Sequence, residues 1–159
     1  CEYIIHSSTD KEHDIPSFMS QWGVDMSFTS RGGVEGMRPT FKKAEREVFL
    51  LQRKKSKVGA NLGKTTGWIH RTELLKKGVE FLSGCDYQRI DDSGLHVDID
   101  GEIRCLDVDT IIVCAGQESN RLLESEVDKP IHFIGGASVA SELDAKRAIK
   151  QGTVLASTI

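Results

Sequence analysis

The chain has 159 residues, of which 38% are hydrophobic and 28% charged, and its formal net charge is -3. This length suits one ordinary domain or parts of two, and the slightly acidic balance argues against a general nucleic-acid-binding protein, which is normally basic overall. No stretch reads as a membrane span or a signal peptide, so we expect no membrane partner.

Charge is distributed unevenly along the chain. Residues 42–57 hold seven basic residues against two acids, whereas residues 86–128 hold twelve acids against three basic residues. A basic segment on a mildly acidic protein suits a small anionic ligand better than a nucleic-acid polymer. We therefore expect no nucleic-acid partner.

The four cysteines, Cys1, Cys85, Cys105 and Cys114, show no metal-type spacing such as C-x-x-C. Cys105 and Cys114 lie in apolar, strand-like surroundings, so we expect both to be reduced core residues, in keeping with a cytoplasmic location. The five histidines form no pair at metal-ligand spacing, and spacing alone assigns no Ser-His-Asp or Cys-His set. His96 is expected at an outward, solvated position of a strand.

The first forty residues show the weakest periodicity. Residues 1–8 read as the end of a helix, and residues 15–23 as one short helix whose apolar side chains share a face. The rest of residues 9–40 is irregular and dotted with Gly and Pro. Because Cys1 is not an initiator methionine, the chain reads as a piece cut from a longer protein.

A β-α-β order follows. Residues 47–52 predict a strand and residues 68–77 predict a helix, with Gly78 at the position of a C-terminal cap. Residues 79–82 predict the next strand. Parallel strands joined by a helix are the building unit of nucleotide-binding sheets.

Three short strands at residues 87–90, 95–99 and 103–108 alternate apolar and polar side chains. The segments between them, residues 91–94 and 100–101, have the Asp-x-x-Gly and Asp-Gly sequences typical of hairpin turns. This pattern predicts an antiparallel meander.

The last third of the chain carries two further apolar runs. Residues 110–114 and 131–134 predict buried strands, each ending in small residues that include Gly116 and Gly136. Residues 141–159 predict a helix. Taken together, the elements predict an α/β fold: a Rossmann-like dinucleotide-binding domain with a parallel sheet and a three-stranded antiparallel meander.

The most informative segment is the basic run that ends the first predicted strand. Residues 48–52 have strand character and pass directly into Arg53, Lys54, Lys55 and Lys57. At this place an NAD-specific site usually carries an acid for the ribose hydroxyl, whereas cations suit the additional phosphate of NADP. The alternative interpretation is a strand followed by a solvated basic turn.

A glycine-dotted segment, residues 59–65, precedes the predicted helix and ends in Gly63-Lys64-Thr65 like a P-loop. It departs from that motif because Val58 stands where the first glycine belongs. A glycine-rich turn before a helix can still help to bind an anion. Trp68 follows, and such a residue either stacks on an adenine or ribose or packs against the sheet.

Four phrases of the chain resemble the C-terminal end of bacterial 2,4-dienoyl-CoA reductases, a family of NADPH-dependent flavin and iron–sulfur enzymes in the old yellow enzyme group. Their element order is also that of flavoprotein disulfide-reductase-like modules with two dinucleotide-binding domains. The phrases cover most of the chain from about residue 48 onward. They are Gln52-Arg53-Lys54-x-Ser56-Lys57, Leu62-Gly63-Lys64-Thr65-Thr66-Gly67-Trp68-Ile69-His70-Arg71, Cys114-Ala115-Gly116-Gln117-Glu118-x-Asn120 and Glu142-Leu143-Asp144-Ala145-x-Arg147-Ala148-Ile149.

The resemblance implies a role for ten residues. It places the 2′-phosphate of NADPH at Arg53, Lys54 and Lys57 and the same nucleotide beside Trp68. Gly116 and Gln117 would lie where the NADPH and FAD domains cross. FAD would be contacted by Gly136, Leu143, Asp144 and Ala145, with helix amides near the flavin end.

The resemblance also divides the chain. Residues 1–120 would form most of the NADPH-binding domain, without its first strand and Gly-rich turn, and residues 121–159 the returning end of the FAD-binding domain. FMN, a 4Fe-4S cluster, the barrel domain and the acyl-CoA site would belong to the upstream part. No catalytic or metal-binding residue is assigned, and the fragment alone is not expected to be active.

The chain departs from the family pattern at Ser138, where an Asp that hydrogen-bonds FAD is usual. Two other functions remain open on the residues. One is a related two-domain flavoprotein, similar to trimethylamine dehydrogenase or an enone reductase. The other is a non-catalytic nucleotide-binding or docking domain.

Overall fold

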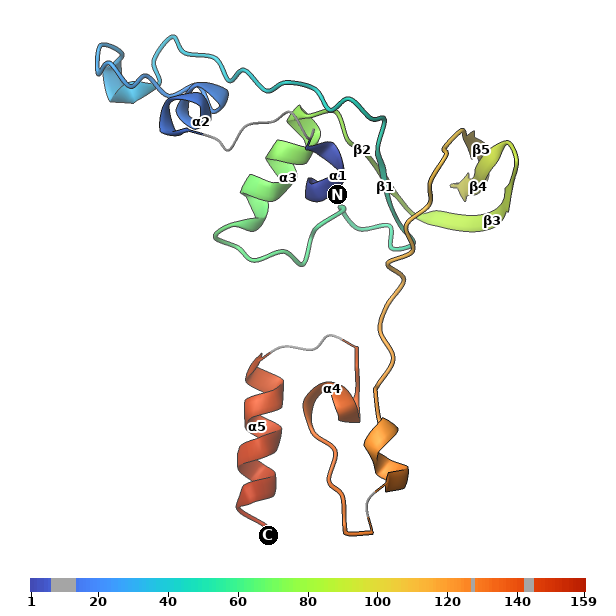
Figure 1. The fold of residues 1–159 in the computed structure, drawn as a ribbon. Helices are drawn as coiled ribbons and strands as arrows, with labels where there is room; N and C mark the ends of the chain where they lie inside the picture. Colours follow the sequence, from blue (N-terminus) through green and yellow to red (C-terminus); the bar gives the residue numbers. More distant parts are fainter. Residues whose placement is uncertain (7–13, 127, 142–144) are drawn as a thin grey trace. The chain divides into compact units, whose positions relative to one another are not determined.

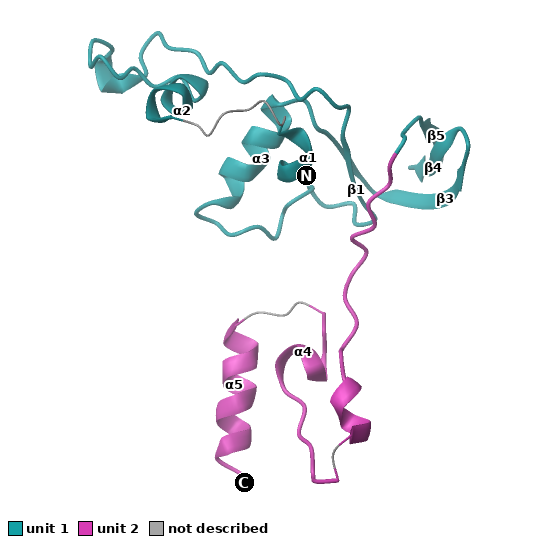
Figure 2. Ribbon diagram, in the orientation of Figure 1, with its two compact units in different colours: residues 1–109 teal, residues 110–159 magenta. Residues whose placement is uncertain are grey.

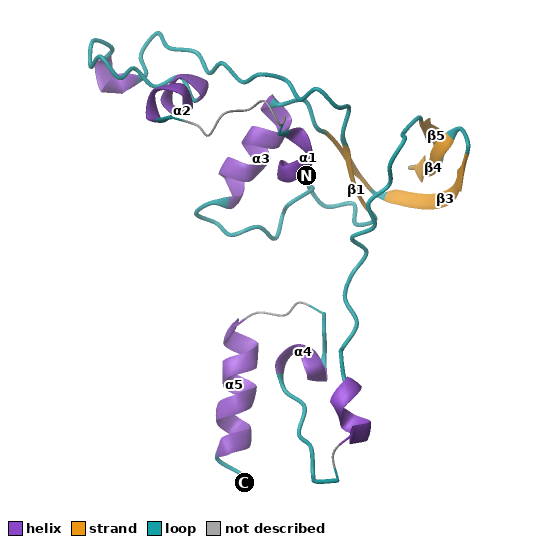
Figure 3. Cartoon of the chain, viewed as in Figure 1, coloured by secondary structure: helices purple, strands orange, loops and turns teal. Residues whose placement is uncertain are grey.

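The computed structural model describes residues 1–6, 14–126, 128–141 and 145–159. These residues form two compact units, residues 1–109 and residues 110–159 (Figure 2). The fold is mixed α/β, with a two-stranded parallel sheet and a three-stranded antiparallel sheet (Figure 1). Both sheets belong to the first unit, whereas the regular structure described in the second is helical (Figure 3).

The first unit begins with two short helices, α1 (Glu2–Ile5) and α2 (Ile15–Gln21). The Oδ1 atom of Asp14 accepts a hydrogen bond of 2.7 Å from the Ser17 amide, which caps the start of α2. The helix predicted over residues 15–23 is thus confirmed. A 3₁₀ turn at Arg31–Gly33 follows.

A β-α-β unit forms the centre of this first unit. Strand β1 (Phe49–Gln52) and strand β2 (Glu80–Ser83) pair in parallel, with Gln52 opposite Ser83, and helix α3 (Gly67–Lys76) connects them. The predicted order of strand, helix and strand is confirmed. The carboxyl ends of both strands therefore lie at one edge of the sheet.

Helix α3 ends in a left-handed cap, as the position of Gly78 predicts. Gly78 has a φ of +95°, and its amide donates to the Leu75 carbonyl at 3.1 Å. The next amide, Val79, donates to the Leu74 carbonyl at 3.0 Å. These two bonds form a Schellman motif, which satisfies carbonyls of the last helical turn and directs the chain into β2.

A small apolar core lies under α3. Its buried members are Ile5 of α1, Val48, Leu74 of α3 and Val79, and partly buried apolar residues from α1 and both strands pack against them. This cluster holds α3 near the sheet and so fixes where the loop between β1 and α3 begins and ends.

The antiparallel sheet is the predicted meander of β3 (Cys85–Asp91), β4 (Gly94–Ile99) and β5 (Glu102–Leu106). Asp100 and Gly101 both have positive φ, +53° and +89°, as a type I′ hairpin turn requires. The β3–β4 register shifts between Tyr87 and Arg89.

In the second unit, a 3₁₀ turn (Leu122–Glu126) is followed by the short helix α4 (Gly135–Ser138) and by α5 (Ala145–Ala156). Helices α4 and α5 are in contact, and the Gly135 amide donates to Oε1 of Gln151 at 2.6 Å. The predicted C-terminal helix is confirmed over the span of α5. Residues 142–144 of its predicted start lie outside the described residues.

The prediction of buried strands at residues 110–114 and 131–134 is wrong. Neither segment is a strand, and Ile112 and Val113 are 62% and 77% exposed. A central parallel strand needs hydrogen-bonded neighbours and covered faces. Within the described residues no strand pairs with either segment, so their apolar side chains remain at the surface.

The expectation of core positions for Cys105 and Cys114 is also wrong. Both are exposed, whereas Cys85, at the start of β3, is buried. Cys105 lies on the strand face that turns away from the buried residues Leu95 and Val97, because side chains alternate along a strand. All four cysteines are free thiols.

No helix within the described ranges is long and apolar enough to cross a membrane.

Candidate nucleotide-binding site

The basic run forms the loop that leaves the carboxyl end of β1. Arg53, Lys54 and Lys57 are all exposed there. The loop lies beside the exit of β2, because the Gly84 amide donates to the Lys54 carbonyl at 3.0 Å. The structure thus gathers the three predicted phosphate-binding cations in one loop at one edge of the parallel sheet.

Gln52, the last residue of β1, shapes this loop from inside. Its Nε2 atom donates to the carbonyl oxygens of Lys54 at 2.9 Å and of Ser56 at 2.5 Å. The side-chain amide therefore binds the loop's carbonyls while the lysine and arginine side chains stay outside. A loop closed in this way presents cations to solvent on a backbone that is already ordered.

The four cations of the run differ in their partners. Lys55 pairs with Asp100 at 2.6 Å, and this hydrogen bond, aided by the carboxylate charge, raises the pKa of Lys55. The side chains of Arg53, Lys54 and Lys57 make no hydrogen bond or ion pair with any residue that the structure describes. These three are the ones that the resemblance assigns to the phosphate.

Arg53 also influences Tyr87 of β3. Burial raises the pKa of the Tyr87 phenol, the neighbouring Cys85 adds to that rise, and the positive charge of Arg53 opposes it. The guanidinium therefore acts on the side of the loop that faces the start of the meander.

The segment between the basic run and α3 is attached to that helix at both ends. Nη1 of Arg71 donates to the carbonyl of the buried Val58 at 2.6 Å. At the helix start, a Cβ on Gly67 would lie 2.4 Å from Cβ of Leu62, so this position requires glycine. The close approach fixes the turn before α3.

Trp68 lies in the first turn of α3 and is 59% exposed. Its indole Nε1 donates to the Thr65 carbonyl at 3.0 Å, and its ring meets the Trp22 ring edge to face at a centroid distance of 6.3 Å. Trp22 in turn contacts Phe41 at 4.9 Å. The packing partner of Trp68 is thus an aromatic cluster, and the exposed part of its ring remains open to a ligand.

The predicted residues of the second unit lie in three segments. Gly116, with a φ of +128°, and Gln117 are exposed in the irregular stretch before the 3₁₀ turn. Gly136 lies in α4, and Ala145 is the first residue of α5. Leu143 and Asp144 lie outside the described residues.

The end of α4, next to Gly136, is held by hydrogen bonds from a side chain to the backbone. The carbonyl of Ser138, which stands where an Asp was expected, accepts a hydrogen bond of 3.0 Å from Nη2 of Arg121. Nε of the same arginine binds the Ala137 carbonyl at 2.9 Å, and its guanidinium lies over the Phe133 ring at 4.6 Å. Arg121 therefore organises the end of α4 and is a residue that sequence reasoning missed.

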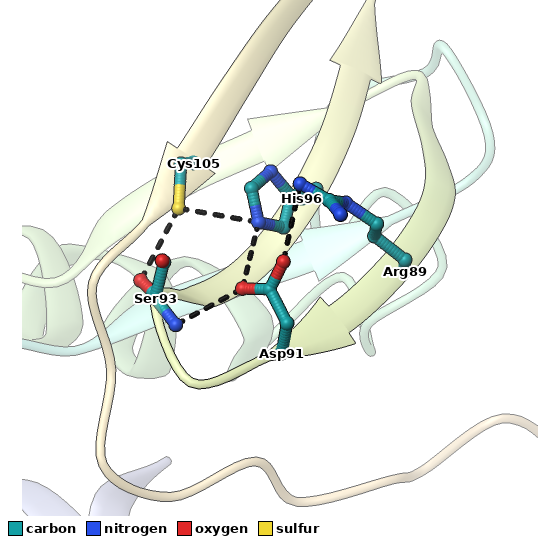
Figure 4. A network of polar contacts seen from close by, with 5 residues as sticks. All are labelled: Arg89, Asp91, Ser93, His96 and Cys105. Carbon is teal, nitrogen blue, oxygen red and sulfur yellow. Dashed lines mark hydrogen bonds and ion pairs between the residues drawn. The ribbon is translucent and has the colours of Figure 1, made fainter.

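A Cys-His contact that spacing could not assign appears in the meander. Cys105, His96 and Asp91 lie together (Figure 4), and the His96 side chain is only 13% exposed, so the expectation of a solvated histidine is wrong. The alternation of apolar and polar residues predicts that His96 lies on the outer face of the strand. It does not predict which side chains lie beside His96, because that depends on the register of three strands.

Among the residues described, no group of three or more His, Cys, Asp and Glu side chains, that of Cys105, His96 and Asp91 included, has an arrangement that could hold a metal ion. No model of a known protein family matches the chain.

Proposed function

We propose that the chain is a C-terminal nucleotide-binding part of an NADPH-dependent flavin and iron–sulfur oxidoreductase that reduces 2,4-dienoyl-CoA in the oxidation of unsaturated fatty acids. Its residues bind and orient NADPH and FAD. The substrate chemistry, FMN and the 4Fe-4S cluster belong to an upstream barrel domain of the same protein. The first unit would be the larger part of a Rossmann-like NADPH domain.

One observation carries the proposal: three unpaired cations follow a parallel strand at the carboxyl edge of its sheet. Ligands of α/β sheets bind at this edge. Arg53, Lys54 and Lys57 have no internal partner among the described residues, so an anion can bind there without displacing an existing ion pair. A phosphate with charge near -2 is the natural complement.

The same residues suit the 2′-phosphate of NADPH. Arg53 supplies a planar fork of N–H donors, and the two lysines supply point charges that adjust to its oxygens. Gln52 keeps the loop carbonyls turned inward, which removes acceptors that would repel the phosphate. When bound, the cofactor supplies a hydride for transfer to FAD, and the loop determines which cofactor enters.

The FAD part of the proposal rests on the resemblance of the second unit. Gly136 and Ala145 would contact FAD together with Leu143 and Asp144. Gly116 and Gln117 would lie near the crossing of the NADPH and FAD domains. The described contact between α4 and α5 holds Gly136 and Ala145 on adjoining elements.

Cofactor titration tests the proposal. We expect the chain to bind NADPH more tightly than NADH, and the double variant Arg53→Ala/Lys54→Ala to lose the difference, by about tenfold or more, because charge-assisted hydrogen bonds to phosphate disappear. Lys55→Ala is the matched control, since it removes a neighbouring charge that is already paired with Asp100.

Equal affinity for NADPH and NADH in the unaltered protein would contradict the proposal. So would an equal loss in Lys55→Ala and in the double variant, because that result would indicate a diffuse charge effect. For the full-length protein, oxidation of NADPH with a dienoyl-CoA acceptor tests the parent reaction.

A further inference from the structure

The irregular part of the chain around α2, residues 14–41, is closed on itself by backbone contacts. The Thr40 amide donates to the Gln21 carbonyl at 3.0 Å. Just after α2 the chain turns through Gly23, whose φ is +72° and where a Cβ would lie 2.8 Å from the Pro39 nitrogen. The end of α2 and the end of this part of the chain are therefore joined, and we call the whole the α2 segment.

The α2 segment meets α3 through a cluster of aromatic rings centred on Trp22. Trp22 is the C-terminal cap of α2 and is partly buried. Its ring centroid lies 4.9 Å from that of Phe41 and 6.3 Å from that of Trp68, and both pairs meet edge to face. Phe18 lies 6.4 Å from the same ring. Edge-to-face contact is a preferred geometry of aromatic pairs, so Trp22 is the residue through which the α2 segment holds Trp68.

Trp68 is held at two points and yet is not covered. Its Nε1 atom donates to the Thr65 carbonyl at 3.0 Å, and Trp22 packs against its ring. The residue nevertheless remains 59% exposed, although tryptophan is highly buried on average. A ring of fixed orientation with much of its surface in water is suited to stacking on a planar ligand.

Trp68 also lies at the ligand-binding edge of the parallel sheet. The chain leaves β1 at the carboxyl edge, enters α3 at Gly67 and returns to the amino edge at Glu80, which pairs with Phe49. The first turn of α3 is therefore the end of the helix on the side of the basic run, where ligands of α/β sheets bind. Cations for a phosphate and an aromatic ring for a base thus belong to one edge.

We propose that Trp22 is a positioning residue of the nucleotide site, which holds the Trp68 ring in the orientation that stacks on the adenine of the bound cofactor. This inference rests on the proposed function, because the adenine is that of NADPH. It gives the α2 segment a role in cofactor binding, although none of its own residues touches the nucleotide. Holding the ring in advance lowers the cost of ordering it when the ligand binds.

Calorimetric titration with 5′-AMP and with ribose 5-phosphate measures the contribution of the base, because these ligands differ in the group at C1′. We expect 5′-AMP to bind about tenfold more tightly or better, as one stacked base contributes. Trp22→Ala should weaken 5′-AMP by about threefold to tenfold and leave ribose 5-phosphate unchanged. The preference for adenosine 2′,5′-bisphosphate over 5′-AMP should persist in Trp22→Ala, because the cations of the basic run are unaltered.

Two further variants separate positioning from folding. Trp22→Phe keeps a ring against Trp68 and should restore most of the affinity for 5′-AMP. Phe28→Ala is the matched control, because it removes another aromatic ring of the α2 segment, one that is 88% exposed, and should leave the affinity unchanged. Since Trp22 and Trp68 are the two tryptophans of the chain, the emission of Trp22→Phe comes from Trp68 alone. We expect 5′-AMP to quench this emission and ribose 5-phosphate not to do so.

Equal affinity of the unaltered protein for 5′-AMP and ribose 5-phosphate would overturn the inference. An unchanged affinity for 5′-AMP in Trp22→Ala, with circular dichroism showing a folded protein, would overturn it too. If Trp22→Ala does not fold, Trp22→Leu, which keeps an apolar side chain in the cluster, is judged by the same criterion. Failure of the proposed function gives a different result: the unaltered protein would prefer 5′-AMP to ribose 5-phosphate but would show no preference for the 2′-phosphate.

Discussion

Nζ of Lys55 lies 2.6 Å from Oδ1 of Asp100, which joins the loop after β1 to the turn between β4 and β5. The two side chains are 80% and 71% exposed, so the pair adds little to stability. The pair matters because it distinguishes Lys55 from the other cations of the basic run. It holds one cation of the basic run, whereas the side chains of Arg53, Lys54 and Lys57 have no partner among the described residues.

Gly94, at the start of β4, is required by its surroundings. Its φ is +122°, and a Cβ there would lie 2.0 Å from the Leu106 carbonyl oxygen. We expect Gly94→Ala to lower the free energy of unfolding by about 3 kcal/mol or more, because the β4–β5 pairing must shift.

Gly101→Ala is the matched control for that change. Gly101 also has a positive φ, +89°, but a Cβ there meets nothing within 4 Å. We expect Gly101→Ala to lower the free energy of unfolding by about 1 to 2 kcal/mol, which is the cost of a left-handed backbone at a residue with a Cβ and involves no steric clash. Urea unfolding of both variants measures the difference, and equal costs would show that the close approach at Gly94 is absent.

Val97 is the most deeply buried side chain of the meander, with 0% exposed. We expect Val97→Ala to cost about 2 kcal/mol, from lost apolar burial and the cavity left behind. Ile103→Ala on the adjacent strand, where the side chain is 70% exposed, should cost less than about 0.5 kcal/mol. A reversed order in thermal unfolding would mean that the sheet buries its other face.

Asp25 is the acceptor of a dense turn at residues 25–30. Its carboxylate accepts from Ser27, Thr29 and Ser30, and these hydrogen bonds, led by the Ser27 hydroxyl, hold the pKa of Asp25 well below its usual range. A lowered folded-state pKa contributes stability that is complete above the unfolded value of about 3.9 and is lost as the pH falls through the folded value.

The turn should therefore remain ordered on mild acidification. We expect NMR titration of the Asp25 carboxyl to show a midpoint below that of an unstructured aspartate, and Asp25→Asn to increase hydrogen exchange at the Thr29 and Ser30 amides at neutral pH. A midpoint at or above about 3.9 would contradict the hydrogen bonding of the turn.

Local signals explain why the sequence predicts much of the first unit. The Asp-Gly pair at residues 100–101 allows few conformations other than a hairpin turn, and Gly78 marks the end of α3 by its left-handed backbone. Residues 110–114 carry no such signal. An apolar run states a preference for burial, but whether neighbouring strands cover it depends on residues far away in sequence.

The candidate site likewise has features that local sequence predicts and features that depend on residues far apart in the chain. A cationic loop after a strand follows from the order of residues 48–57 alone, and the structure places it at the sheet edge. The pairing of Lys55 with Asp100 spans 45 residues, and the meeting of His96 with Cys105 depends on strand register. Neither has a local signature, so the charge pattern alone does not distinguish Lys55 from the other three cations of the loop.

The central claim is that Arg53, Lys54 and Lys57 recognise a 2′-phosphate. Calorimetric titration with adenosine 2′,5′-bisphosphate and with adenosine 5′-monophosphate tests it most directly, because the two ligands differ only in that phosphate. We predict tighter binding of the bisphosphate, a preference that weakens with salt and is lost in Arg53→Ala/Lys54→Ala but kept in Lys55→Ala. Equal binding of the two ligands, or an equal loss in Lys55→Ala, would contradict the account.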